Sequence, residues 1–469
     1  MPLKHNKRPP SSAEHVASLN HELAEFDQRH IWHPFTQHQI YDSLSEPLVF
    51  SRGEGFDLID TDGNRYLDGF SSIWCNVHGH GVPQLVEAIQ QQAAELCHST
   101  LLGMSHRPIV ELTRALRRVV PDKLQRFFYA DSGSNAVEAA LRMCIEWWQK
   151  QTGAAARKRT KFLSLNGSYH GDTLGSVSVG FCREFHAALA PIVVQALRFD
   201  PPHVFRFYQQ LSLADACERS LSNLRTMLET EGDSLAAVII EPLMQAAAGI
   251  WDHPPAYLNE VCRLCREREV LVILDEVATG FGKSGKLFAF EALDGFVPDV
   301  LVLAKGLTGG YLPLSVAITT DRIFEGFLGE IEEYKALYYG QTFAGTAVAT
   351  ASLQLFESHG LLNRLPQMIR NFHELLDSNI APLAHVDEIR RVGVMVGIEL
   401  TSAPGERKPY QPEELAGWRI ANEARKRGGL IRPLGNVMIL MPAVAMDDRN
   451  IEKLVSVTAE SIVAALGDN

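Results

Sequence analysis

Three segments of the sequence place a reactive side chain directly after an apolar run or at the start of a helix-forming one. Lys305 ends DVLVLAK, Asp275 ends VLVILD, and the Ser-Gly-Ser turn at 132–134 precedes NAVEAALRM. Lysine is seldom fully buried unless it is paired, and an unpaired carboxylate away from water is costly. The two charged groups therefore indicate a site for chemistry rather than packing alone.

The chemistry that suits these groups is that of pyridoxal 5'-phosphate. A lysine amine can form a Schiff base with its aldehyde, and a carboxylate can keep its pyridine nitrogen protonated. Backbone N–H groups at a helix start bind phosphate, and Ser134, beside Gly133, adds a hydroxyl donor. Ser134 could equally be a simple N-cap residue. The ordered set of segments predicts a pyridoxal phosphate site.

A fourth segment, SLNGSYHGDTLG (residues 164–175), adds the aromatic side chain of Tyr169 beside His170. A ring in this glycine-rich loop could stack on a cofactor or line a substrate pocket. It could as well be a turn tyrosine that covers the sheet edge. The residues alone leave both interpretations open.

The elements that must position these groups are strands of a parallel sheet. LAAVIIEP (235–242), VLVILDE (270–276) and DVLVLAK (299–305) are apolar throughout, which is typical of strands covered on both faces. They alternate with helical patterns, so we predict an α/β fold. Lys305 follows Asp275 by thirty residues, enough for one crossover helix. Open α/β sheets bind ligands at the carboxyl ends of their strands, where these groups would meet.

The element pattern divides the chain into two domains. Residues 1–22 are expected to form a polar tail, with folded structure starting near Leu23, and residues 23–84 an N-terminal segment that joins the small domain. Residues 85–345 are predicted to form the large cofactor-binding domain. Residues 346–469 carry long amphipathic stretches with a few strands, typical of a smaller α+β domain.

Composition favours a soluble, cytoplasmic protein. The 469 residues are 46% hydrophobic and 21% charged, with a formal charge of −12 that argues against nucleic acid or an anionic membrane as partner. No apolar run is long enough for a membrane span, and the start lacks a secretory signal. Seven cysteines suggest a reducing compartment. Cys262 and Cys265 form one CxxC without a second pair, so no metal is expected.

Beyond these features, DEVATGFGKSGKLFAFE (275–291) and PDVLVLAKGLTGGYLP (298–313) resemble the lysine region of class III pyridoxal-phosphate aminotransferases. The resemblance covers residues 26–460 and is strongest to the biotin-pathway branch of that family. The motifs that carry it are RHIWHPFTQ, DGFSSIWCNVHGHG, CHSTLLGMSH, YADSGS, NGSYHGDT and IRPLGNVMILMP. It implies a fold-type I architecture with a mostly parallel central sheet, helices on both faces and a smaller α+β domain.

The resemblance also assigns roles to residues. It makes Lys305 the Schiff-base lysine and Asp275 the partner of the pyridinium nitrogen, while Gly133 and Ser134 bind the phosphate. Tyr169 would pack over the ring and contact substrate.

Two further matches concern the partner subunit and the substrate. Gly340, Gln341 and Thr342 in YYGQTFAG match a segment that reaches the partner subunit's cofactor phosphate, which implies a homodimer with shared active sites. Arg432 matches an arginine whose bidentate fork binds the substrate carboxylate, although an Arg-Pro pair can also be a surface cation before a strand.

Departures from the family pattern concern the amino donor. Phe35 and Ile439 stand where well-known members have tyrosines, and Ile73 replaces a tryptophan, although Trp74 follows. These changes remove polar groups from the donor side. Ala247 replaces a glutamate found in ornithine and 4-aminobutyrate aminotransferases, which argues against those two activities.

The resemblance therefore implies amino transfer to 8-amino-7-oxononanoate, giving 7,8-diaminononanoate, with S-adenosylmethionine as donor. One branch of the family uses lysine instead, and another class III ω-aminotransferase activity is a further alternative. A catalytically silent, pyridoxal-phosphate-binding scaffold is the alternative from outside the enzymes.

Overall fold

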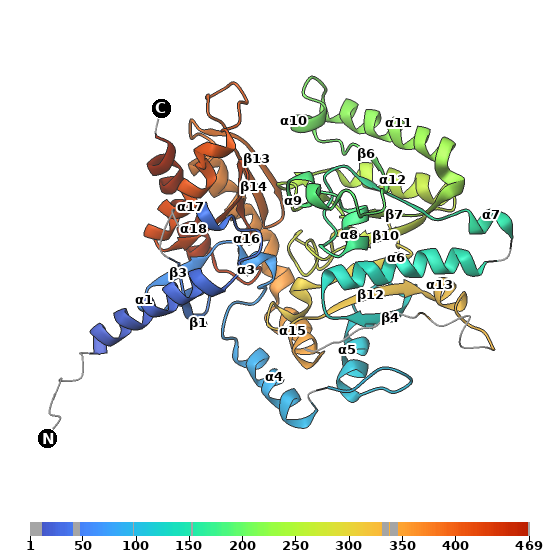
Figure 1. Cartoon of the computed structure of the whole chain (residues 1–469), viewed down its shortest axis with the longest axis horizontal. Coiled ribbons are helices and arrows are strands. Elements are labelled where there is room, and N and C mark those ends of the chain that lie inside the picture. Colours follow the sequence, from blue (N-terminus) through green and yellow to red (C-terminus); the bar gives the residue numbers. More distant parts are fainter. Residues whose placement is uncertain are drawn as a thin grey trace.

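A seven-stranded sheet forms the centre of the larger part of the molecule (Figure 1). The computed structural model describes residues 12–40, 47–96, 98–151, 153–330, 337 and 346–467. The strand order is β4-β12-β11-β10-β7-β5-β6, and only β12 runs antiparallel to its neighbours. The strands are β4 (Leu124–Ala130), β5 (Lys161–Leu165), β6 (Leu197–Phe199), β7 (Leu235–Ile240), β10 (Leu271–Asp275), β11 (Val300–Leu303) and β12 (Ser315–Thr320). The predicted mostly parallel sheet is confirmed.

Side chains of the central strands alternate between two apolar layers. On β10, Leu271 and Ile273 pack in the layer that contains helix α6 (Gly133–Lys150). Val272 and Leu274 pack in the other layer, which contains residues of α11 (Leu213–Glu231) and α12 (Pro255–Glu267). Because successive strand residues point to opposite faces, helices cover both faces, as predicted.

The connection between β10 and β11 differs from the prediction. In place of a crossover helix it contains turns and one four-residue 3-10 helix, η3 (Ala289–Ala292). The buried Glu276 carboxylate accepts hydrogen bonds from the Thr279 hydroxyl (2.9 Å) and the N–H groups of Ala289 (3.0 Å) and Phe290 (2.7 Å). Burial raises the pKa of Glu276 to about 7. A side chain that satisfies backbone donors allows a non-helical connection to be buried.

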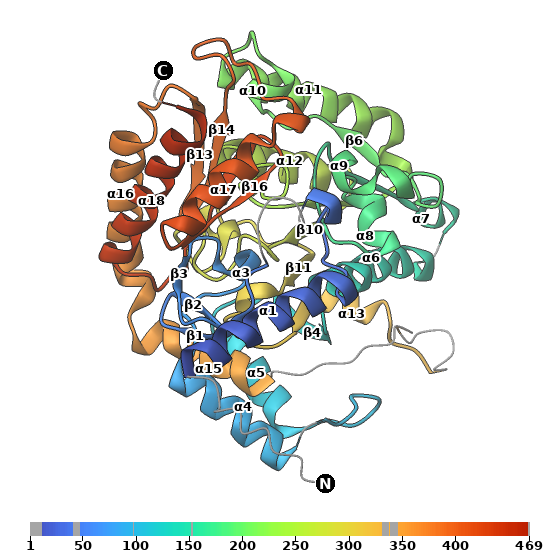
Figure 2. The same ribbon diagram turned by 60° about the vertical axis from the view of Figure 1, so that its left-hand side comes forward.

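Two smaller sheets lie beside the large one (Figure 2). One has the order β1-β2-β3-β15, and in it Leu67 of β3 pairs with Gly429 of β15, so both ends of the chain share a sheet. The other is antiparallel, with the order β13-β14-β17-β16. Their strands are β1 (Phe50–Glu54), β2 (Asp57–Asp60), β3 (Arg65–Asp68), β13 (Val386–Val392), β14 (Met395–Leu400), β15 (Gly429–Leu430), β16 (Arg432–Leu434) and β17 (Val437–Leu440), and a hairpin is formed by β8 (Met244–Gln245) and β9 (Trp251–Asp252).

The remaining α-helices pack on the large sheet, on the smaller sheets or between them. They are α1 (Ser12–His30), α3 (Ser71–Trp74), α4 (Pro83–Glu95), α5 (Arg107–Arg117), α7 (Ala154–Arg157), α8 (Leu174–Val179), α9 (Arg183–His186), α10 (Val204–Phe207), α13 (Asp321–Glu325), α15 (Thr346–Ser358), α16 (Leu361–Asn379), α17 (Ala416–Lys426) and α18 (Asp448–Leu466). Helix α15 packs against α4 and α5 as well as α16. It therefore connects the two parts, and the domain boundaries stay a prediction.

The predicted start of folded structure near Leu23 is wrong, because α1 already begins at Ser12. Ala24 is buried and fixes the helix against the rest of the molecule. Once a helix is anchored, each added residue forms a further backbone hydrogen bond, so the helix extends beyond its docked part.

The cysteine pair in α12 belongs to the packed interior. Cys262 and Cys265 are both buried, and burial raises the pKa of Cys262 to about 12. The six cysteines of the described residues are free thiols, and that part of the chain contains no cluster of three or more potential metal ligands. None of its helices is long and apolar enough to cross a membrane.

Candidate active site

A cavity of about 650 Å³ lies at the carboxyl ends of β7, β10 and β11, facing the β13-β14-β17-β16 sheet. It brings together most of the residues singled out from the sequence, namely Phe35, Ile73, Trp74, Gly133, Ser134, Tyr169, Asp275, Lys305, Arg432 and Ile439. Gly340, Gln341 and Thr342 lie outside the described residues, so their assignment stays a prediction.

Lys305 enters the cavity directly after β11, at the start of the 3-10 helix η4 (Lys305–Thr308). Its backbone is left-handed, with φ of 45°. The amine Nζ lies 4.6 Å from the centroid of the Trp74 ring. Burial lowers the pKa of Lys305, although nearby groups such as Cys75 and Asp275 partly oppose this shift. A larger share of the amine is therefore neutral near pH 7 than in an exposed lysine.

Asp275 ends β10 and is held by two hydrogen bonds. Its Oδ2 lies 2.7 Å from Nδ1 of His170, and its Oδ1 accepts the N–H of Val277 (3.0 Å). Nε2 of His170 is buried and has no hydrogen-bond partner among the described residues. Each carboxylate oxygen can accept a second hydrogen bond, so Asp275 keeps capacity for a donor inside the cavity.

The start of α6 forms a further wall of the cavity. The N-cap is Ser132, whose Oγ accepts the N–H of Asn135 (3.3 Å), so Ser134 is not the cap residue. Oγ of Ser134 accepts the N–H of Asp172 (3.1 Å), which leaves its own hydrogen available. A side chain on Gly133 would lie 2.9 Å from Val277, so this close approach needs glycine. Backbone N–H groups in the first helical turn lack intrahelical partners, which suits a phosphate.

Tyr169 lines the cavity rather than only covering the sheet edge. Its hydroxyl donates to Asp172 (2.6 Å), and its ring stacks on His186 with centroids 5.7 Å apart. His186 also bonds the other oxygen of Asp172 (3.1 Å), and this bond lowers the pKa of that carboxyl. Burial raises the pKa of Tyr169, so the phenol stays neutral. The ring is therefore fixed from two sides.

Two features of the site were not predicted from the sequence: Glu241 as a residue of the cavity, and His170 as the hydrogen-bond partner of Asp275. Glu241 follows β7, lines the cavity and is fully buried, and burial raises its pKa to about 7. Its carboxylate accepts the N–H groups of Tyr169 (3.2 Å) and Ala246 (2.9 Å). It thus connects two walls of the cavity. A charged residue after LAAVII follows the same rule that pointed to Asp275 and Lys305.

Arg432 lies on β16, where it lines the cavity rather than the outer surface. Its guanidinium is 5.6 Å from the Trp418 ring and donates to the Phe35 carbonyl (3.2 Å). Burial lowers its pKa. In the described part of the chain no carboxylate forms an ion pair with it. An unpaired cation facing a mostly apolar cavity fits a carboxylate ligand.

The proposed donor side of the cavity is apolar. The Phe35 ring packs edge-on against Phe185 with centroids 5.2 Å apart, and Ile439 is buried beneath Ala247 and its neighbours. Ile73 is 46% exposed and contributes to the same lining. These side chains supply no hydroxyl group for a polar ligand.

An unusual backbone conformation holds Ile73 and Trp74 at the cavity. Four consecutive residues, Ser71 to Trp74, have positive φ angles of 52°, 48°, 64° and 67°. A left-handed helical turn costs about 1–2 kcal/mol per residue for side chains other than glycine. The sequence DGFSSIWC contains no glycine at these four positions and so gives no signal of this turn.

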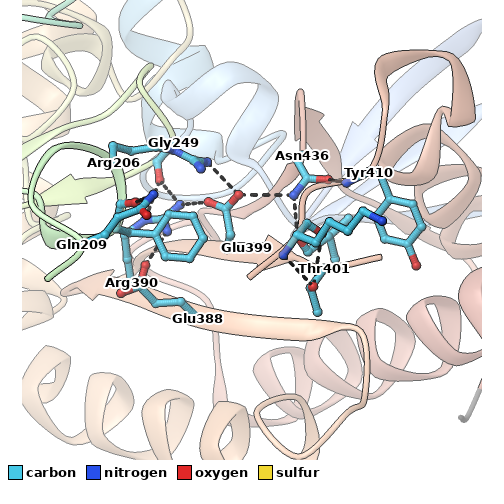
Figure 3. Close-up of polar contacts among 12 residues, drawn as sticks. Arg206, Gln209, Gly249, Glu388, Arg390, Glu399, Thr401, Tyr410 and Asn436 are labelled. Carbon is cyan, nitrogen blue, oxygen red and sulfur yellow. Dashed lines mark hydrogen bonds and ion pairs between the residues drawn. The ribbon is translucent and has the colours of Figure 1, made fainter. Parts of the chain in front are cut away.

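A buried ion-pair network fixes the β13-β14-β17-β16 sheet against the rest of the site (Figure 3). Glu399 of β14 accepts from Arg206 of α10 (2.6 Å) and from Arg390 of β13 (2.9 Å). Arg390 also donates twice to the Gly249 carbonyl (3.1 and 2.9 Å), in the β8–β9 hairpin that carries Ala247. The network therefore sets how the strands with Arg432 and Ile439 face the large sheet.

Comparisons with known proteins identify the family of the chain. The family model for class-III aminotransferases matches residues 40–462. The adenosylmethionine-8-amino-7-oxononanoate aminotransferase of Nitratidesulfovibrio vulgaris is 43% identical over 97% of this chain and 83% of its own length. The crystal structure of the enzyme of that name from Methanocaldococcus jannaschii has a TM-score of 0.88 at 38% identity, covering 95% of this chain and 99% of its own. A PLP-bound amine transaminase from an uncultivated Pseudomonas species has a TM-score of 0.86 at 30% identity, covering 93% of this chain and 99% of its own. The chain belongs to the class-III aminotransferase family.

Proposed function

We propose that this chain is a pyridoxal-phosphate-dependent transaminase that converts 8-amino-7-oxononanoate to 7,8-diaminononanoate, with S-adenosylmethionine as amino donor. The observation that carries the proposal is one cavity with Lys305, Asp275 and the start of α6 on one wall and, on another, Arg432, which has no ion-pair partner among the described residues. The proposal is supported by relatives of that name at 43% and 39% identity over almost the whole chain.

The residues of the cavity fit pyridoxal 5'-phosphate. Bound there, the cofactor supplies an aldehyde carbon that combines with amines and a ring that withdraws electrons from the attached carbon. The N–H groups of Gly133 and Ser134 would hold its phosphate, and Asp275 its ring nitrogen. Tyr169 forms a wall fixed firmly enough to pack over the ring, through Asp172 and Glu241.

Lys305 is the residue that moves protons. Because burial lowers its pKa, a larger share of its amine is neutral than in an exposed lysine, and the neutral amine can take a proton from a substrate carbon and return it to another position. Asp275, anchored by His170 and Val277, presents its oxygens in a fixed direction. Preorganised acceptors need no rearrangement during the reaction, which is the usual source of electrostatic catalysis.

Arg432 would bind the carboxylate at the far end of the oxo acid. The apolar lining from Phe35, Ile73 and Ile439 suits the methylene chain of such a substrate and excludes water from it. Because this lining lacks the hydroxyl groups that the family pattern has on the donor side, lysine is the alternative amino donor.

The functional unit in this proposal is a homodimer. Gly340, Gln341 and Thr342 would reach the cofactor phosphate of the partner subunit. Apolar side chains are strongly exposed in the single chain, with Trp32 at 89%, Leu102 at 86% and Met104 at 60%, which supports their burial against a partner. Light scattering of the purified protein should give twice the mass of one chain, and a monomer would contradict the shared site.

The test of the function uses the absorbance of the bound cofactor. The protein loaded with pyridoxal phosphate should show a visible band that is absent from Lys305→Ala. S-adenosylmethionine should convert the bound aldehyde form to the amine form, and lysine should be tested beside it. If lysine alone converts it, the donor assignment is wrong. If no cofactor binds at all, the enzyme proposal is wrong.

A further inference from the structure

The left-handed turn Ser71–Trp74 is held in its strained conformation by one buried carboxylate. Asp68, at the end of β3, accepts the N–H of Ser72 on Oδ1 (3.0 Å) and the Ser72 hydroxyl on Oδ2 (2.8 Å). Nε2 of His80 also lies within hydrogen-bond distance of Oδ2 (3.1 Å). Asp68 is 3% exposed, so water competes little with these bonds.

The other end of the turn is fixed by the backbone around it. The Ser71 hydroxyl donates to the Met441 carbonyl (2.5 Å), directly after β17. Within the turn, the N–H groups of Trp74 and Cys75 bond the carbonyls of Phe70 and Ser71, both at 2.9 Å. A strained conformation persists only where the surroundings over-determine it, as they do here.

The strained turn sets the position of the Trp74 ring. The indole is nearly buried and its centroid lies 4.6 Å from Nζ of Lys305. The backbone after Trp74 also touches the loop that follows the lysine, because a side chain on Gly310 would lie 2.9 Å from the Cys75 carbonyl carbon. The turn and the lysine loop are therefore packed directly on one another.

We propose that Asp68 is a positioning residue that holds the Ser71–Trp74 turn left-handed and so keeps the Trp74 indole against the Lys305 amine. The reason is geometric. A right-handed turn is intrinsically favoured for these four residues, and it would direct their side chains differently. The Asp68 bonds to Ser72 oppose that change. An aromatic face near an ammonium group favours its charged form, so the contact tunes how readily Lys305 releases a proton.

The inference rests on the proposed function only in that Lys305 is the reactive amine. Its test therefore uses two readouts. In the holoenzyme, the pH midpoint of the cofactor absorbance reports proton binding at the Lys305 nitrogen. In the full chain freed of cofactor, the pH dependence of Lys305 acetylation by acetic anhydride, followed by peptide mass spectrometry, reports the lysine pKa. If no cofactor band forms, the proposed function fails and the acetylation readout still decides on Asp68.

The variants are Asp68→Asn, Trp74→Leu and both together. A cation–π contact corresponds to about half to one pKa unit, so each single variant should lower the lysine pKa by that amount. If Asp68 acts through Trp74, Asp68→Asn should change the lysine pKa by less than about 0.2 unit in the Trp74→Leu background.

Asp60→Asn is the matched control. It removes a buried carboxylate of the same sheet that bonds Asp62, Asn64 and Tyr66 away from the cavity, and it should leave the lysine pKa unchanged.

An unchanged lysine pKa in Asp68→Asn would overturn the proposal. Equal shifts with and without Trp74 would also overturn it, because Asp68 would then act through its own charge. Should Asp68→Asn fail to fold, Ser72→Ala removes one of the bonds to Asp68 and keeps the charge. It should shift the pKa in the same direction by a smaller amount, and no shift in a folded Ser72→Ala protein would contradict the inference.

Discussion

Removing the Glu399 carboxylate should destabilise the junction between the β13-β14-β17-β16 sheet and the large sheet. Glu399 is 0% exposed and accepts from Arg206, Arg390 and Asn436 at 2.6, 2.9 and 3.2 Å. In Glu399→Ala the Arg390 guanidinium, 2% exposed, loses this counter-charge and keeps only Glu388 and the Gly249 carbonyl. Breaking a buried ion pair in this way costs about 3–5 kcal/mol.

The assay is urea unfolding followed by circular dichroism and tryptophan fluorescence, with the free energy of the first transition as readout. Glu399→Ala should lower it by about 3–5 kcal/mol. A double-mutant cycle with Arg390→Met should recover about 1–3 kcal/mol relative to the sum of the single changes, because the buried Arg390 charge is then removed together with its partner, and the remaining cation, Arg206, is 31% exposed to water. Glu423→Ala is the control, since Glu423 bonds Lys426 and Arg427 on the surface of α17 and should matter much less. A loss below about 1 kcal/mol for Glu399→Ala, or strict additivity, would refute the reasoning.

Three further outcomes are expected. Arg432→Met should raise KM for the oxo acid roughly 10- to 100-fold with little change in kcat, because hydrogen bonds to a charged group contribute about 1.5–3 kcal/mol; a change confined to kcat would contradict a binding role. Glu241→Gln should gain stability relative to wild type as pH rises from about 5 to 8. Burial raises the pKa of Glu241 from 4.5 to about 7 on folding, so between these two pH values the folded wild type binds a proton that the unfolded chain has released. The free energy of unfolding of wild type therefore falls by up to about 3 kcal/mol as pH rises through this range, and that of Glu241→Gln does not. A constant difference between the two proteins across this range would contradict the prediction. Ser72→Gly should lose less stability than Ser72→Ala, because both remove the hydroxyl bond to Asp68 and only glycine adopts a left-handed backbone without strain; an equal or larger loss for Ser72→Gly in urea unfolding would show that the turn is not strained.

The residues of the site that could be predicted are charged residues that directly follow apolar stretches of the sequence. Lys305 and Asp275 each end an apolar strand, and a charged residue in such a place stands out in the sequence. Parallel strands bring such residues to one edge of the sheet, and the cavity lies there. The same contrast at Glu241 was available and was overlooked.

The parts that could not be predicted depend on tertiary hydrogen bonds. The connection after β10 lacks the predicted helix because Glu276 satisfies its backbone donors, and no local pattern announces that. The left-handed turn at Ser72 depends on Asp68 and on Met441, which lies 370 residues from Ser71. Helix α1 begins before the predicted start because its anchoring at Ala24 is a tertiary contact.

The function itself was suggested by motifs rather than by the separate reactive residues. Lys305, Asp275 and Ser134 indicate a cofactor, and they are compatible with many reactions on it. The resemblance of the longer segments points to the oxo acid, and it is supported by the relatives that match almost the whole chain. Gly340, Gln341 and Thr342 remain predictions, because they lie outside the described residues.

Amino transfer to the oxo acid within this cavity can be observed in one half-reaction. The most direct measurement is a single turnover in which protein loaded with pyridoxamine 5'-phosphate is mixed with 8-amino-7-oxononanoate. The absorbance of the Lys305-bound aldehyde cofactor should return and one 7,8-diaminononanoate should form per site, as detected by mass spectrometry. Cofactor that stays in the amine form, with no diamine produced, would contradict the proposed function.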